Sequence, residues 1–148
     1  MKHNDILRVS GKSLIPFILM FGLYVQFHGD YGPGGGFQAG VIFAAGVVLY
    51  TLIFGLRRAR RVFSPRTMEA WICAGVLLYG SVGLLSMLRG GTFLDYNVLS
   101  HDPIHGQHWG ILWVELGVGI TVTAVMITLF FLFAGRGLRG PSRLDHED

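Results

Sequence analysis

Four long apolar runs constrain the fold of this chain more than any other feature of its sequence. They cover about residues 12–28, 37–56, 69–88 and 109–133. A helix needs about 20 mainly apolar residues to cross the hydrocarbon core of a bilayer, so each run is a candidate membrane span. Only 14% of the residues are charged, against about 25% in a typical soluble domain. The sequence predicts an all-α integral membrane protein: a bundle of four transmembrane helices in a single membrane domain over residues 1–148.

The basic residues predict how these spans are oriented, because lysine and arginine near span ends are retained on the cytoplasmic side. Three segments on one side of the predicted bundle carry Lys2, Arg8, Lys12, Arg57, Arg58, Arg60, Arg61, Arg66, Arg136, Arg139 and Arg143. The other two connections carry only Arg89. We therefore expect both termini and a tail over residues 134–148 to be cytoplasmic, and residues 89–108 to form an outer loop. This asymmetry also explains the run "RRARR", so no nucleic-acid partner is expected.

The predicted outer face carries titratable side chains: His28, Asp30, His101, Asp102, His105 and His108. Imidazoles and carboxylates bind zinc when three or four of them converge. The spacing of His101 and His105 suits a helix, but Pro103 and Gly106 argue against a regular helix in this segment. We therefore interpret the segment as a solvated loop with no metal site. The single cysteine, Cys73, excludes a disulfide framework within the chain, and no cofactor is expected.

The stretch "HGDYGPGGGFQAG", residues 28–40, contains six glycines. A reversal between two spans needs only one or two of them, so the others indicate that a neighbouring backbone or an ion comes very close. A nucleotide-binding loop is excluded, because no strand precedes the stretch and the required Lys-Ser/Thr is missing. The residues assigned to close packing, or to a loop near an ion, are Pro33, Gly34, Gly35, Gly36, Phe37 and Gly40.

Small residues also recur along the faces of three predicted spans. In lipid, such faces allow helices to associate closely. The second span has Gly36, Gly40 and Ala44 on one face, the third has Ala70, Ala74 and Ser81, and the fourth has Gly110, Gly117, Thr121, Ala124 and Thr128. We expect these faces to be used partly within the bundle and partly against partner subunits.

Glu115 is the candidate for an ion path. It lies about two turns into the fourth span, where a charged group is costly unless it is paired, hydrated or protonated. At helical spacing it points away from the small-residue face of that span, on the same side as His108, Leu112 and Gly119. Two interpretations follow: a titratable group on or beside a proton or cation path, or a structural carboxylate that is hydrogen-bonded to a partner helix.

Two segments resemble a known family. "PGGGFQAGVIFAAGVVLY" and "GILWVELGVGITVTAVMITLFF" are similar to the B subunit of Mrp-type (Mnh-type) multisubunit Na+/H+ antiporters. The resemblance implies a small subunit of the bacterial inner membrane that works only with other membrane subunits. The exchanged ions would be protons and Na+ or another monovalent cation. It also implies a role in assembly of the complex, with a contribution to the ion path as a further possibility.

Two alternatives remain open. The same module occurs in membrane-bound hydrogenase complexes of the complex I type, and only the identity of the partner subunits separates that host from an antiporter. A free-standing metal-sensing or pH-sensing bundle would instead use the outer histidines. A stand-alone transporter is disfavoured, because the spans offer one carboxylate, no lysine and no clear internal repeat. The sequence shows no nucleophile paired with a base and no cofactor motif, so no enzyme activity is expected.

Overall fold

The computed structural model describes residues 3–29, 32–100 and 102–137, and the regular elements in these ranges are all helical. Five helices of α type follow one another: α1 (His3–His28), α2 (Gly36–Phe54), α3 (Leu56–Val62), α4 (Pro65–Leu88) and α5 (Pro103–Gly137). A short 3-10 helix, η1 (Tyr96–Leu99), lies between α4 and α5. This arrangement confirms the predicted all-α class.

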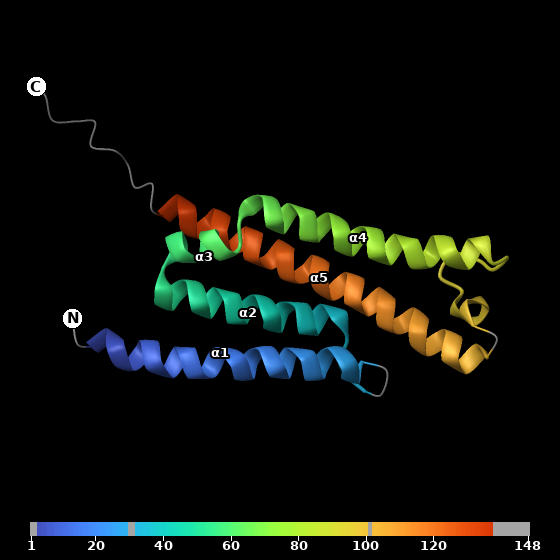
Figure 1. Cartoon of the computed structure of the whole chain (residues 1–148), viewed down its shortest axis with the longest axis horizontal. Coiled ribbons are helices and arrows are strands. Elements are labelled where there is room, and N and C mark those ends of the chain that lie inside the picture. The colour runs from blue at the N-terminus through green and yellow to red at the C-terminus, as the bar shows by residue number, and fades with distance from the viewer. Residues whose placement is uncertain (1–2, 30–31, 101, 138–148) are drawn as a thin grey trace, which may run out of the picture.

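Four of the helices are long and apolar enough to cross a membrane: α1, α2, α4 and α5. They lie side by side in the order α1, α2, α5, α4, as Figure 1 shows. The central helix is α5, which packs against α2 on one side and α4 on the other. Helices α2 and α5 run in the same direction, while α1 and α4 run opposite to them (Figure 1). The four-span prediction is therefore confirmed.

The basic connection between the second and third spans contains a seven-residue helix, α3. Gly55 has φ +89° and separates α2 from α3. A left-handed backbone conformation is accessible to glycine at little cost, so the chain can turn sharply here and begin a new helix. Ala59 is fully buried, whereas Arg57, Arg58 and Arg61 on the same helix are exposed. The basic run is thus an amphipathic helix at one end of the bundle.

The expectation that Pro103 and Gly106 prevent a regular helix is wrong. Pro103 is the first residue of α5, and a first-turn proline loses nothing, because its missing N–H would have no partner within the helix. The Asp102 carboxylate accepts a hydrogen bond from the Ile104 N–H at 3.1 Å and caps the helix. Gly106 packs against the Tyr96 carbonyl oxygen, which would stand 2.5 Å from a β-carbon at this position.

The bundle buries a small core and leaves large apolar surfaces uncovered. The buried cluster consists of Ala44, Ala59, Met68, Ala124, Ile127 and Phe131. By contrast, Phe17 on α1 is 67% exposed and Leu77 on α4 is 71% exposed. Helix α1 packs mainly on α2 and has little contact with α5. Apolar surface of this extent requires lipid or other membrane helices to cover it.

The structure brings the basic connections to one end of the bundle. This end holds the start of α1, the whole of α3 and the end of α5, whereas the turn after α1 and the segment with η1 lie at the opposite end (Figure 1).

In a Cys73→Ser background, a Thr92→Cys variant should react with an impermeant thiol reagent on intact cells. An Arg61→Cys variant should react only after permeabilisation, because basic ends stay cytoplasmic. The reverse labelling pattern would show that the orientation is wrong.

Candidate functional site

The carboxylate of Glu115 lies in a space bounded by glycine backbone. Glu115 is half-buried on α5. A β-carbon on Gly35 would stand 2.7 Å from Glu115 Oε1, and one on Gly29 would stand 2.5 Å from Oε2. Both distances are shorter than van der Waals contact, so a side chain at either position would displace the carboxylate. The carboxylate therefore occupies space that is available only because residues 29 and 35 have no side chain.

Helices α2 and α5 touch through their main chains beside this carboxylate. A β-carbon on Gly36 would overlap the carbonyl oxygen of Glu115 and stand 2.8 Å from its carbonyl carbon. One turn later, a β-carbon on Gly40 would stand 2.8 Å from the Gly119 carbonyl oxygen. Thr123 Oγ1 donates a hydrogen bond to the Gly40 carbonyl oxygen at 3.2 Å. Such an approach is open only to a helix without side chains at the contact.

The turn before α2 folds back against the end of α1. The Gly35 N–H donates a hydrogen bond to the Val25 carbonyl oxygen at 3.2 Å. A β-carbon on Gly34 would stand 2.9 Å from the same oxygen. Gly35 has φ +108°, which L side chains rarely adopt. Pro33 and Phe37 flank these glycines and are exposed. Of the six residues assigned to close packing, Gly35 and Gly36 meet Glu115.

The N-terminus of α2 faces the Glu115 carboxylate. The N-cap residue is Gly35, and no side chain of the cap accepts a hydrogen bond from the first N–H groups of the helix. These groups carry a partial positive charge, equivalent to about half an elementary charge at the helix end. Because the carboxylate oxygens border Gly35, the carboxyl group lies in the positive field of α2.

Gln26 is a polar residue near this site that the sequence analysis does not single out. It lies on α1 and is only 5% exposed. Its Nε2 has no hydrogen-bond partner among the described residues. Its Oε1 would stand 2.7 Å from a β-carbon on Gly119, one turn of α5 from Glu115. The signal that could have found it is an uncharged amide inside an apolar span, since a buried polar group costs energy unless it is satisfied.

Gln26 also borders an apolar cavity beside the site. The cavity has a volume of about 400 Å³, and its lining on α5 extends from Leu116 to Ile127. Phe27 of α1 and Trp71 of α4 form parts of its walls. The buried amide of Gln26 therefore lines a cavity whose other walls are mainly apolar.

The predicted outer-face residues do not form one cluster in the part of the chain that the structure describes. His105 Nδ1 lies 3.0 Å from Asp102 Oδ2, and both side chains are exposed. This hydrogen bond, with the one from the Ile104 N–H, holds the pKa of Asp102 below its ordinary value. His28 stacks on Tyr24 at the end of α1, with ring centroids 5.2 Å apart. His108 is exposed on α5.

Residues 3–29, 32–100 and 102–137 contain no group of three or more His, Cys, Asp or Glu that could hold a metal ion. Asp30 and His101, the other two residues predicted for this face, lie outside the described residues. Within the described ranges, the outer face supplies the Asp102 cap at the start of α5.

The small-residue face of α5 packs against α4, so both sides of α5 are in contact with other helices. A β-carbon on Gly117 would stand 2.9 Å from the Gly75 carbonyl oxygen, and Gly75 packs against Thr121. The face of α4 predicted from Ala70, Ala74 and Ser81 is exposed. That face is free, within this chain, to meet lipid or a partner helix.

Comparisons with known proteins find similarity along most of the chain. A family model described as a domain related to the MnhB subunit of Na+/H+ antiporters matches residues 6–128. A Staphylococcus haemolyticus (strain JCSC1435) protein named "Putative antiporter subunit mnhB2" is 30% identical over 139 residues. A Staphylococcus aureus (strain Newman) protein of the same name is 32% identical over 139 residues. Each alignment covers 91% of this chain and 98% of the relative.

The contact between α2 and α5 predicts which glycines tolerate a methyl group. Gly36→Ala should destabilise the folded chain by about 1–3 kcal/mol, the usual cost of overpacking, because its β-carbon would meet the main chain of Glu115. The expected result is a lower melting temperature and less folded protein in the membrane, measured after mild detergent extraction.

Gly80→Ala is the matched control, because no atom lies within 4 Å of a β-carbon built on Gly80 and its φ is not positive. It should leave the melting temperature unchanged or raise it, since alanine is the better helix former. Equal effects of the two substitutions would contradict the close backbone contact.

Proposed function

This chain belongs to the family of MnhB subunits of Na+/H+ antiporters, and from that premise we propose that Glu115 lies on the path of the exchanged ions. The chain is a membrane subunit of a multisubunit antiporter, so it works with other subunits of that complex. We further propose that the transported species near this chain are protons and Na+ or another monovalent cation, and that the host membrane is the bacterial inner membrane.

The observation that carries this proposal is the setting of the carboxylate. Glu115 is half-buried within a helix that is apolar enough to span the membrane. Ionisable residues at such depth are rare and are concentrated at ion and proton pathways. The carboxylate borders the backbone of Gly29 and Gly35, so no side chain at these two positions separates it from the main chain.

The helix end beside Glu115 supports a role in cation exchange. The N-terminus of α2 carries a partial positive charge, equivalent to about half an elementary charge. We propose that the carboxylate at this helix end binds and releases a proton or a monovalent cation, as a transport path requires.

Gln26 extends the polar region from Glu115 toward the interior of the bundle. Its amide is buried, and the Nε2 has no partner among the described residues. Both amide ends can bind water, and the Oε1 can also ligate a cation. We propose that Gln26 and Glu115 together form a short polar section of the path, completed by helices of neighbouring subunits against the exposed apolar faces.

The two alternative functions, a subunit of a redox-driven complex and a free-standing sensor, have less support. The named relatives are antiporter subunits, so they favour an antiporter over a redox-driven complex. A free-standing metal sensor would need its ligands to converge, and residues 3–29, 32–100 and 102–137 contain no group of three or more His, Cys, Asp or Glu that could hold a metal ion. We propose that the chain contributes to transport and assembly and catalyses no chemical reaction of its own.

The proposal predicts different results for two glutamine substitutions of membrane-helix carboxylates. Glu115→Gln keeps the shape and hydrogen-bonding capacity of the side chain but cannot titrate. It should leave the complex assembled while lowering Na+/H+ exchange by at least about tenfold, or about 1.4 kcal/mol in the transport barrier. Glu115→Asp should retain part of the activity. Exchange is measured in inverted vesicles and normalised to the amount of intact complex.

Glu69→Gln is the control, since Glu69 is exposed on α4. It should leave both assembly and exchange unchanged. If Glu115→Gln keeps the wild-type rate and pH profile, the carboxylate is structural and the ion-path proposal fails.

A further inference from the structure

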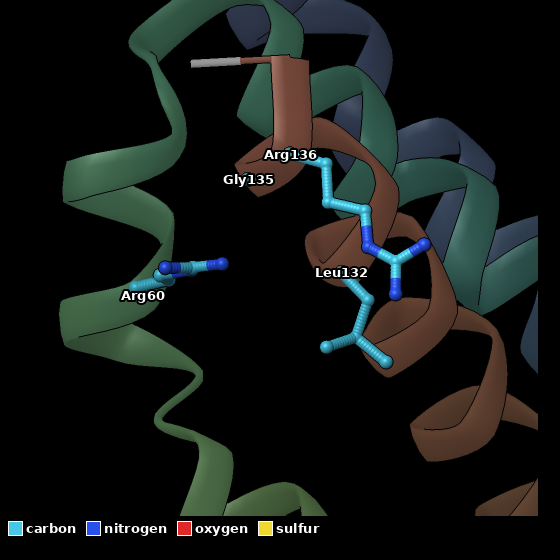
Figure 2. Close-up of a pocket in the computed structure, with 4 residues that line it drawn as sticks. All are labelled: Arg60, Leu132, Gly135 and Arg136. Atoms are coloured by element: carbon cyan, nitrogen blue, oxygen red, sulfur yellow. The ribbon is translucent and has the colours of Figure 1, made fainter. Parts of the chain in front are cut away.

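A basic pocket lies where α3 meets the C-terminal end of α5, far from Glu115 along the bundle. Its volume is about 280 Å³, and its lining residues are Arg60, Leu132, Gly135 and Arg136 (Figure 2). We call it the Arg60 pocket. It lies at the end of the bundle that carries α3 and the last turns of α5 (Figure 1). On the orientation inferred from the basic residues, this end lies at the cytoplasmic membrane surface.

Arg60 is held in place by contacts with α5. Its Nη2 donates a hydrogen bond to the Phe131 carbonyl oxygen at 2.8 Å, and its guanidinium carbon lies 6.0 Å from the centroid of the Phe131 ring. A β-carbon on Gly135 would stand 2.7 Å from Nη2, so glycine at this position lets the guanidinium lie close to α5. Figure 2 shows Arg60 reaching from α3 into the gap toward α5.

This arrangement leaves Arg60 able to bind an anion. A guanidinium has five N–H donors, and the bond to Phe131 uses one of them. A pre-oriented guanidinium is well suited to a phosphate group, because two of its N–H donors match two phosphate oxygens. Arg136 on α5 also lines the pocket and carries a second positive charge.

The apolar part of the pocket indicates the source of the phosphate. Leu132 lines the pocket one turn before Arg136, so both lie on the same face of α5, as Figure 2 shows. Leu132 and Leu129 are exposed and continue this face toward the middle of the span. A free phosphate ion gains nothing from exposed leucines, whereas a phospholipid can bind its phosphate at the arginines and lay an acyl chain along the leucines.

We propose that the Arg60 pocket binds the phosphate group of an anionic phospholipid, with Arg60 as the oriented donor, Arg136 as the second charge and α5 as the surface for the acyl chain. Basic pockets at the cytoplasmic ends of membrane helices are suited to such head groups. The three remaining arginines of α3, Arg57, Arg58 and Arg61, are exposed and lie outside the pocket lining. The proposal does not depend on Glu115.

The test uses the intact complex, purified through a tag on this chain and stripped of lipid. The probe is a phosphatidylglycerol with a photoactivatable group on an acyl chain, and the readout is the labelling of α5 peptides, located by mass spectrometry. Arg60→Gln combined with Arg136→Gln should lower labelling about fivefold for each arginine removed. Arg58→Gln combined with Arg61→Gln removes the same charge from residues outside the pocket lining, and should retain most of the labelling.

Two further arms keep the result unambiguous. Because Arg60→Gln also removes the bond to Phe131, Arg136→Gln alone is tested as well, and about fivefold weaker labelling is expected. Inorganic phosphate at millimolar concentration should leave labelling unchanged. Equal loss in the two double variants, or wild-type labelling in Arg136→Gln, would overturn the proposal. Displacement of the lipid by inorganic phosphate would overturn the lipid as the source and identify a free-phosphate site.

Discussion

The main-chain contact between α2 and α5 is the constraint on which the rest of the structure depends. Gly36 approaches the Glu115 carbonyl group, and Gly40 approaches that of Gly119, so two parallel helices lie closer than any side chain would permit. In lipid, helices gain little from burying apolar surface against one another, and close packing supplies the association instead. The same contact puts the first N–H groups of α2 beside a membrane carboxylate, so one interaction fixes the helix pair and the electrostatics of the site.

The bundle around this contact is an open row rather than a closed core. Helix α5 is covered on two sides, by α2 and α4, whereas α1 and α4 have outward faces rich in exposed apolar residues. The small residues Ala70, Ala74 and Ser81 lie on one such face of α4. A chain built in this way is incomplete by itself in a physical sense, because its stability in the membrane depends on what covers these faces. This agrees with its membership of a family of antiporter subunits.

Much of this architecture could be predicted from the sequence, because hydropathy and charge are properties of single segments. The four spans, the glycine stretch and the membrane carboxylate are visible in that way. The meeting of Gly35 and Glu115 is not, since helical periodicity assigns a face to each helix but does not say which helix that face contacts. Helix α3 could not be predicted from hydropathy, because it is short and rich in arginine, and only Gly55 marks its start. The prediction of a loop at Pro103 is wrong, because proline stops a helix in its interior but suits its first turn.

The glycine border of Glu115 also limits how this site can be altered during evolution. A site lined by side chains can be retuned by exchanging them one at a time, but the backbone of Gly29, Gly35 and Gly36 is the same chemical surface in any sequence that keeps the fold. Replacement of these residues brings steric overlap before it brings new chemistry. Changes that retune this site are therefore expected at the carboxylate itself, at Gln26 or in neighbouring subunits. The glycine border offers no side chain through which the site could be altered.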